Sequence, residues 1–378
     1  MTAPIYLDYN ATTPVAPEVA AAMRPWIEEQ FGNPSSSHIY GQRARQAIDR
    51  ARESVAALIG ARTDEIVFTG SATEANNLAL LGVARAMPPH RRHLIVSAVE
   101  HPAVMQPALH LRDEGWSLTV LPVDEFGRVS LDDLRAALRP DTALVSVMHA
   151  NNEVGAIQPV AEIAALARAN GTLVHTDAAQ SAGKVELDVA ILGVDLLTLA
   201  GHKFYAPKGV GALYVRRGTP IKPILFGADQ EHGLRPGTEN VAQIVGLGEA
   251  ARLARARLPL VTRRLAALRD ELHRRLADGA PGLVLNGHPE QRLPNTLHVS
   301  FPGVSGRDLL AAVSEVAASV GSACHSDADA VSGVLAAMGC NAARARGAVR
   351  LSVGFPTTPA HIESAACFLV NAWRAMAP

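Results

Sequence analysis

Lys203 and Asp177 each stand at the end of a predicted apolar strand, where charged side chains are uncommon. A buried carboxylate such as Asp177 needs a partner, and either a protonated heterocyclic nitrogen or a nearby arginine would serve. A lysine such as Lys203 avoids the cost of a buried charge when it forms an imine with an aldehyde. Alternatively, Lys203 is an ordinary surface lysine in a loop, as is predicted for Lys208. The pair indicates chemistry on an aldehyde carried by a protonated ring.

Other predicted strands also end in polar residues that suit a ligand, although each has an ordinary structural explanation. Ala72 and Thr73 lie where a helix begins, so their N–H groups form either a phosphate cradle or a plain helix cap. His101 is either a capping residue or a ring that stacks on a ligand and moves protons. Asn151 and Asn152 offer amide donors to a ligand, or form a polar turn.

These features form a set only when they are taken together. A phosphate cradle, a ring-stacking histidine, an acid for a ring nitrogen and an imine-forming lysine are what pyridoxal phosphate (PLP) requires, and the acid keeps the ring able to accept carbanion charge. A dinucleotide site competes poorly, because no GxGxxG motif follows a strand.

The elements that must position these residues are short apolar strands that alternate with helices. The strands are predicted at 65–69, 93–99, 117–123, 142–150, 171–179, 195–203 and 211–217, and the helices at 74–86, 102–114, 130–138 and 160–169. This alternation is typical of an α/β fold with a mostly parallel central sheet and helices on both faces. Ligands of such sheets bind at the carboxyl ends of the strands, where the residues above stand.

The pattern changes after about residue 241. A long helical region runs to about residue 277, and shorter strands follow at 283–285, 296–301, 316–320 and 348–353. We expect a smaller α+β domain here, and the N-terminal segment IYLDYNATTP is expected to associate with it or with the domain boundary. The predicted division is a large domain of residues 14–257 and a small domain of residues 1–13 with 258–378.

Composition excludes several classes of protein. The 378 residues are 48 % hydrophobic and 19 % charged with a net charge of −1, so disorder and a general affinity for nucleic acid or anionic membranes are not expected. The N-terminus lacks the features of a signal peptide, and no apolar run reaches the roughly 18 residues that span a bilayer. A cytoplasmic, reduced protein is predicted.

Cys324 has four possible roles: metal ligand, half of a disulfide, core thiol or nucleophile. The three cysteines form no CxxC pair and have no zinc spacing, and a reduced compartment disfavours a disulfide. Small residues around Cys324, in SVGSACHSD, predict a mobile loop rather than a core strand, so the role of nucleophile stays open, with His325 or His101 as candidates to assist the thiolate. Cys340 and Cys367 lie on Ala-rich runs and are predicted to be core thiols.

The sequence resembles the NifS/IscS-like cysteine desulfurases and selenocysteine lyases, which have the class V aminotransferase fold. The similar blocks run in order from residue 6 to residue 354: YLDYNATTP, FGNPSSSH, FTGSATEANN, EHPAV, NNEVG, HTDAAQSAGK, GHKFYAPKGVGALYVRRG, RPGTEN, LPNT, VGSACHS and VRLSVG. Two positions depart from many relatives: Ala200 replaces a serine that bonds the phosphate, and Ser71 replaces a glycine.

The resemblance implies a fold type I PLP-dependent transferase and a role for each matching residue. Lys203 would form the imine, Asp177 would pair with the ring nitrogen and His101 would stack on the ring. Asn152 and Gln180 would support the ring, and the phosphate would be bound by Ala72, Thr73 and His202. Thr238 would contact the phosphate of the neighbouring subunit. The substrate carboxylate would be bound by Asn33 and Arg350 with Asn152 nearby, and Cys324 would accept the sulfur.

The implied activity is the removal of sulfur from L-cysteine, which gives L-alanine and a persulfide on Cys324. The alternative is a selenocysteine lyase, which converts L-selenocysteine to L-alanine and selenide. The role of Thr238 implies a homodimer, and the persulfide implies a sulfur-acceptor protein, with iron–sulfur cluster assembly among the pathways served. No metal, membrane or direct nucleic-acid partner is expected.

Overall fold

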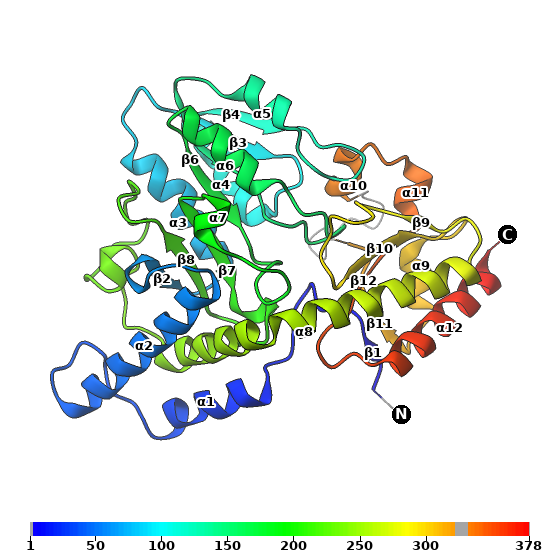
Figure 1. Cartoon of the computed structure of the whole chain (residues 1–378), viewed down its shortest axis with the longest axis horizontal. Coiled ribbons are helices and arrows are strands. Elements are labelled where there is room, and N and C mark those ends of the chain that lie inside the picture. The colour runs from blue at the N-terminus through cyan, green and yellow to red at the C-terminus, as the bar shows by residue number, and fades with distance from the viewer. Residues whose placement is uncertain (1–2, 322–331, 378) are drawn as a thin grey trace.

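The computed structural model describes residues 3–321 and 332–377 (Figure 1). Its largest element is a seven-stranded sheet in the order β2-β8-β7-β6-β5-β3-β4. The strands are β2 (Ile66–Thr69), β3 (His93–Ser97), β4 (Ser117–Leu121), β5 (Thr142–Ser146), β6 (Leu173–Asp177), β7 (Leu196–Ala200) and β8 (Gly211–Val215). Neighbouring strands from β4 to β7 run parallel, and only β8 is antiparallel to its neighbours. The predicted mostly parallel sheet is confirmed.

Helices cover both faces of this sheet, and alternating side chains of each strand supply the two apolar layers. In β2, Ile66 and Phe68 belong to one buried cluster and Val67 belongs to the other. The helices of this part are α1 (Pro17–Glu28), α2 (Ile39–Leu58), α3 (Ala72–Ala86), α4 (Pro102–Asp113), α5 (Leu131–Ala137), α6 (Val160–Ala169) and α7 (Val189–Leu192). Strands that bury both faces read as continuous apolar runs, which is why the sequence predicted them well.

A second apolar core lies in the C-terminal part of the chain. Its strands are β9 (Val284–Leu285), β10 (Thr296–Ser300) and β12 (Ala348–Ser352) in one antiparallel sheet, with β1 (Ile5–Tyr6) and β11 (Val316–Ala317) paired in parallel beside it. Helices α9 (Gly306–Ala311) and α12 (Pro359–Met376) pack in this core, whereas α10 (Gly333–Ala337) and α11 (Ala342–Arg346) pack against a separate small cluster that includes Val99 and Met148. The pairing of β1 with β11 brings the N-terminal segment against this part of the chain.

One helix, α8 (Val241–Gly279), runs across both cores (Figure 1). Leu247 near its start is buried in the core beside the large sheet, whereas Leu272 near its end is buried in the second core. The predicted domain boundary between residues 257 and 258 falls inside this helix, and the division stays a prediction.

The prediction that both remaining cysteines are core thiols is wrong. Cys367 is exposed, because the buried stripe of α12 runs through Ile362, Ala365, Leu369 and their neighbours and leaves residue 367 on the outer face. Cys340 is half-buried in the loop between α10 and α11, where it packs against a small apolar cluster.

Candidate active site

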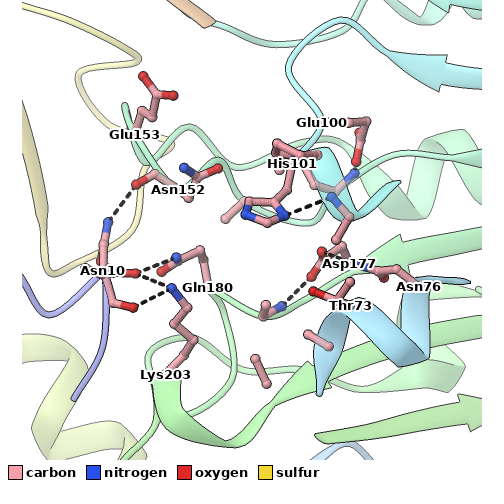
Figure 2. A pocket seen from close by; sticks show the side chains of 18 of the residues that line it. Asn10, Thr73, Asn76, Glu100, His101, Asn152, Glu153, Asp177, Gln180 and Lys203 are labelled. Atoms are coloured by element: carbon pink, nitrogen blue, oxygen red, sulfur yellow. Dashed lines mark hydrogen bonds between the residues drawn. The ribbon is translucent and has the colours of Figure 1, made fainter. Parts of the chain in front are cut away.

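A cavity of about 370 Å³ opens at the carboxyl ends of the parallel strands (Figure 2). Nine of the predicted site residues line it: Ala72, Thr73, His101, Asn152, Asp177, Gln180, His202, Lys203 and Arg350. Asn33 and Thr238 do not line it, and both are exposed elsewhere on the chain. Cys324 lies outside the described residues, but Gly321 and Gly333, on either side of that segment, line the cavity wall.

Asp177 is the last residue of β6, and its side chain is only 6 % exposed. One carboxylate oxygen accepts a hydrogen bond from Nδ2 of Asn76 at 2.7 Å, and the other accepts from the backbone N–H of Ala179 at 2.9 Å (Figure 2). These donors are neutral, and among the described residues no arginine or lysine pairs with Asp177. The carboxylate is therefore held in place with its negative charge available to a cation in the cavity.

Lys203 follows β7 in a single 3₁₀ turn. Its Nζ donates to the backbone oxygens of Asn10 at 2.6 Å and Ala11 at 2.8 Å, so the N-terminal segment holds the amine at the cavity (Figure 2). Both of these carbonyls are neutral acceptors that hold the amine in position. This position suits a lysine that bonds covalently to an aldehyde.

His101 caps the N-terminus of α4, where its Nδ1 accepts from the backbone N–H of Ala103 at 3.1 Å. This contact makes Nδ1 the acceptor and leaves the proton of the neutral ring on Nε2. Burial lowers the pKa of His101 below its usual value; Asp177 opposes this shift and Lys203 adds to it. The capping role and a ring-stacking role therefore coexist, because only Nδ1 is used by the helix.

The first turn of α3 brings backbone N–H groups to the cavity. Ala72 and Thr73 are its first residues, and such N–H groups have no acceptor within the helix. Ser71 is the N-cap, accepting from Glu74 N–H at 3.1 Å, so the helix begins two residues before its predicted start. Gly211 permits this close packing, because a Cβ there would lie 2.8 Å from the backbone carbon of Ser71. Free N–H groups at the start of a helix are able to bind an anion such as a phosphate.

His202 lies beside this turn in the cavity lining, together with Ala200. Burial, and then the positive charge of Lys203, lowers the pKa of His202 to about 4. Its Nδ1 lies 3.1 Å from Oγ1 of Thr12. A neutral ring of this kind contributes a hydrogen bond rather than a charge to a bound phosphate.

Arg350 in β12 reaches the cavity from the second core, and its side chain is 4 % exposed. Its Nη1 donates to the backbone oxygen of Asn152 at 2.9 Å, and its Nη2 pairs with Asp8 at 2.8 Å. Its buried Nε has no partner among the described residues.

Asn151 is not a ligand-binding residue: it is fully buried and its amide holds the turn of residues 151–154.

The cavity lining also includes three residues for which no role was predicted from the sequence: Asn10, Asn76 and Glu100. Asn10 lies in the N-terminal block of the family resemblance, and Glu100 directly precedes His101. These positions were the only features of the sequence that indicated a place for Asn10 and Glu100 in the site. Glu100 Oε1 accepts from the Ser97 hydroxyl at 2.5 Å and from Met148 N–H at 2.8 Å, and its buried Oε2 has no partner among the described residues. Burial raises the pKa of Glu100 to about 8, so the carboxyl is mainly neutral at pH 7.

The donor set fits PLP. A carboxylate held only by neutral donors suits a protonated ring nitrogen, a neutral imidazole suits the face of the ring, and a helix start suits the phosphate. Lys203 supplies the amine, and the cavity volume accommodates a small ring with an amino acid attached.

Comparisons with known proteins agree with this geometry. Residues 5–364 match the family model described as Aminotransferase class-V. The chain is 47 % identical to the cysteine desulfurase IscS of Dictyoglomus turgidum over 356 residues, which is 94 % of this chain and 90 % of the relative. A solved NifS-like protein aligns with a TM-score of 0.91 at 37 % identity, covering 98 % of this chain and 99 % of that one. A protein named SspA, solved in complex with cysteine, aligns with a TM-score of 0.81 at 37 % identity, covering 92 % and 98 %.

Proposed function

The chain belongs to the class V aminotransferase family, and from this premise we propose that it is a PLP-dependent cysteine desulfurase that acts on L-cysteine. The observation that carries the proposal is the meeting of Lys203, Asp177 and His101 at one cavity, each at the end of a different strand or at the start of a helix. The 47 % identity to a named cysteine desulfurase over most of both chains supports the same activity.

Bound PLP supplies an aldehyde for the substrate amine and a ring that withdraws electrons from the substrate Cα. Asp177 would hold the ring nitrogen in its protonated form, and His101 would lie against the ring as a neutral imidazole. Lys203 would hold the cofactor at rest, and its free amine would move the proton at the substrate Cα. The N–H groups of Ala72 and Thr73, with His202, would bind the phosphate.

Arg350 and Asn152 would bind the carboxylate of L-cysteine. The guanidinium donors reach the cavity, and the unpartnered Nε leaves bonding capacity for a ligand. Asp8 already neutralises part of this charge, so the substrate carboxylate would share Arg350 with it. Asn33 remains a proposed carboxylate ligand, although it does not line the cavity of the single chain.

Cys324 would attack the sulfur of the bound cysteine, which yields L-alanine and a persulfide for transfer to an acceptor protein. The position of Gly321 and Gly333 at the cavity wall supports this role, since described residues on both sides of Cys324 line the site.

We propose delivery of the sulfur to iron–sulfur cluster assembly in the cytoplasm, supported by the IscS relative. Thr238, which is exposed, would reach the phosphate of the neighbouring subunit in a homodimer. Among the described residues, no helix is long and apolar enough to cross a membrane.

The test is an assay of L-alanine and sulfide from L-cysteine, with PLP bound and a reducing agent present. Cys324→Ala should abolish sulfide release but keep PLP bound, whereas Cys367→Ala, at an exposed position outside the site, should remain active. Full sulfide production by Cys324→Ala would contradict the proposal. Turnover of L-selenocysteine with almost none of L-cysteine would identify a selenocysteine lyase instead.

A further inference from the structure

Lys184 is a buried lysine that the proposed chemistry does not use. Its side chain is only 6 % exposed, and it does not line the cavity. Its Nζ donates to the backbone oxygen of Gln180 at 2.9 Å and to Oε1 of the same residue at 3.1 Å. Among the described residues it forms no ion pair, and burial of an unpaired ammonium is costly. A position that served only packing would favour an apolar side chain.

The contact with Lys184 fixes which way the amide of Gln180 faces. An ammonium only donates hydrogen bonds, so the amide oxygen of Gln180 must be the atom that meets it. The amide nitrogen then points the other way, and it donates to the backbone oxygen of Asn10 at 3.0 Å (Figure 2). An amide nitrogen carries two protons, so a second one remains for a group in the cavity that Gln180 lines.

The same carbonyl connects this pair to the reactive lysine. The backbone oxygen of Asn10 accepts from both Gln180 Nε2 and Lys203 Nζ, so Lys184, Gln180 and Lys203 form one hydrogen-bonded series. Two positive charges act on Lys184, that of Lys203 and that of Arg350. Burial, followed by these two positive charges, lowers the pKa of Lys184 to about 7, and a bound anion would favour its charged form.

We propose that Lys184 is a positioning residue, which turns the Gln180 amide so that an N–H faces bound PLP and which adds a positive charge behind that donor. The inference rests on the proposed function, because it assigns Lys184 a role toward that cofactor. With PLP bound, Lys184 would stabilise a negatively charged oxygen of the cofactor through Gln180, and its own charge would disfavour protonation of the Lys203 nitrogen. Without Lys184 the amide oxygen loses its donor, and only the Asn10 carbonyl holds the orientation of the amide.

The test uses Lys184→Met, which keeps the length of the side chain but has neither charge nor donor. Lys208→Met is the matched control, because Lys208 is exposed in a loop. The pH midpoint of the visible absorbance change of the PLP-bound enzyme is measured without substrate, and PLP affinity is measured by titration of the cofactor-free protein. We expect the midpoint of Lys184→Met to rise by about 1 pH unit and its PLP affinity to fall about tenfold. Lys208→Met should match the wild type.

An unchanged midpoint and affinity in Lys184→Met would overturn the inference while leaving the proposed function intact. Failure of the wild-type protein to bind PLP would instead refute the proposed function. If Lys184→Met does not fold, Gln180→Glu provides the second test, because it keeps a partner for Lys184 but removes the N–H donor. Its midpoint should also rise, and an unchanged midpoint there would overturn the inference.

Discussion

Replacing Glu100 with glutamine should remove a pH-dependent loss of stability that is built into the cavity wall. The Glu100 carboxyl is buried beside Asp177, and its pKa rises from 4.5 to about 8, mainly because burial disfavours the charged form. In the unfolded chain the same group loses its proton near pH 4.5. Between these two pH values the folded protein holds a proton that the unfolded chain does not, so stability falls as the pH rises.

The size of the effect follows from the two pKa values. Each pH unit between 4.5 and about 8 costs the folded wild-type protein about 1.4 kcal/mol relative to a variant that cannot ionise, which amounts to roughly 5 kcal/mol in total. The loss is absent below pH 4.5 and complete above about pH 8. Glutamine keeps the acceptor for Ser97 and Met148, but its buried amide protons add a cost of about 1–3 kcal/mol that does not depend on pH.

The assay is urea unfolding of the wild type and Glu100→Gln at several pH values from 5 to 9. The difference in unfolding free energy should move steadily in favour of the variant as the pH rises, whatever its value at pH 5. Glu53→Gln is the control, because Glu53 is exposed, and its difference from the wild type should stay constant with pH. A difference between wild type and Glu100→Gln that does not change from pH 5 to pH 9 would refute the reasoning.

Three further predictions test the site and its supports. Asp177→Asn should keep PLP bound but lower turnover of L-cysteine at least about 100-fold, because an amide cannot hold the ring nitrogen protonated; turnover near the wild-type rate would contradict this. Gly211→Ala should weaken PLP binding in a cofactor titration, since the added Cβ would lie 2.8 Å from the backbone of Ser71 at the start of α3. Unchanged affinity would show that this turn relaxes freely. Arg52→Met should destabilise the protein by about 3–5 kcal/mol in urea unfolding, because it leaves the buried carboxylate of Glu231 unpaired, and a loss below about 1 kcal/mol would argue against a buried ion pair.

The sequence predicted the large sheet well because each of its buried strands is a short apolar run. The predicted strand at 142–150 nevertheless runs four residues past the end of β5 at Ser146, since the four residues that follow are also buried and three of them are apolar. Helices α1 and α2 were not predicted. Helix α2 has few large apolar residues, and it packs through small ones such as Ala44, Ala47 and Ala51, which give a weak periodic signal.

The site was predictable where a functional group stands directly after a strand, as with Asp177 and Lys203. It was not predictable where the group acts through a contact between distant segments. Asn10 and Lys203 meet only because the N-terminal segment passes over the carboxyl end of β7, and nothing in the local sequence of either residue indicates this. The pairing of Arg350 with Asp8 is of the same kind.

The position of Asn10 has a consequence for the timing of synthesis. Its backbone N–H donates to Ser352 at 2.9 Å and its side chain donates to Thr296 at 2.9 Å, so the residue that holds Lys203 is itself anchored by parts of the chain made long after it. At about 5–20 residues per second, a ribosome takes roughly 20–70 s to pass from residue 10 to residue 352. Until then the large sheet is able to form, but the lysine lacks its anchored carbonyl partners. The nascent chain therefore completes this part of the cavity only after residue 352 has been translated.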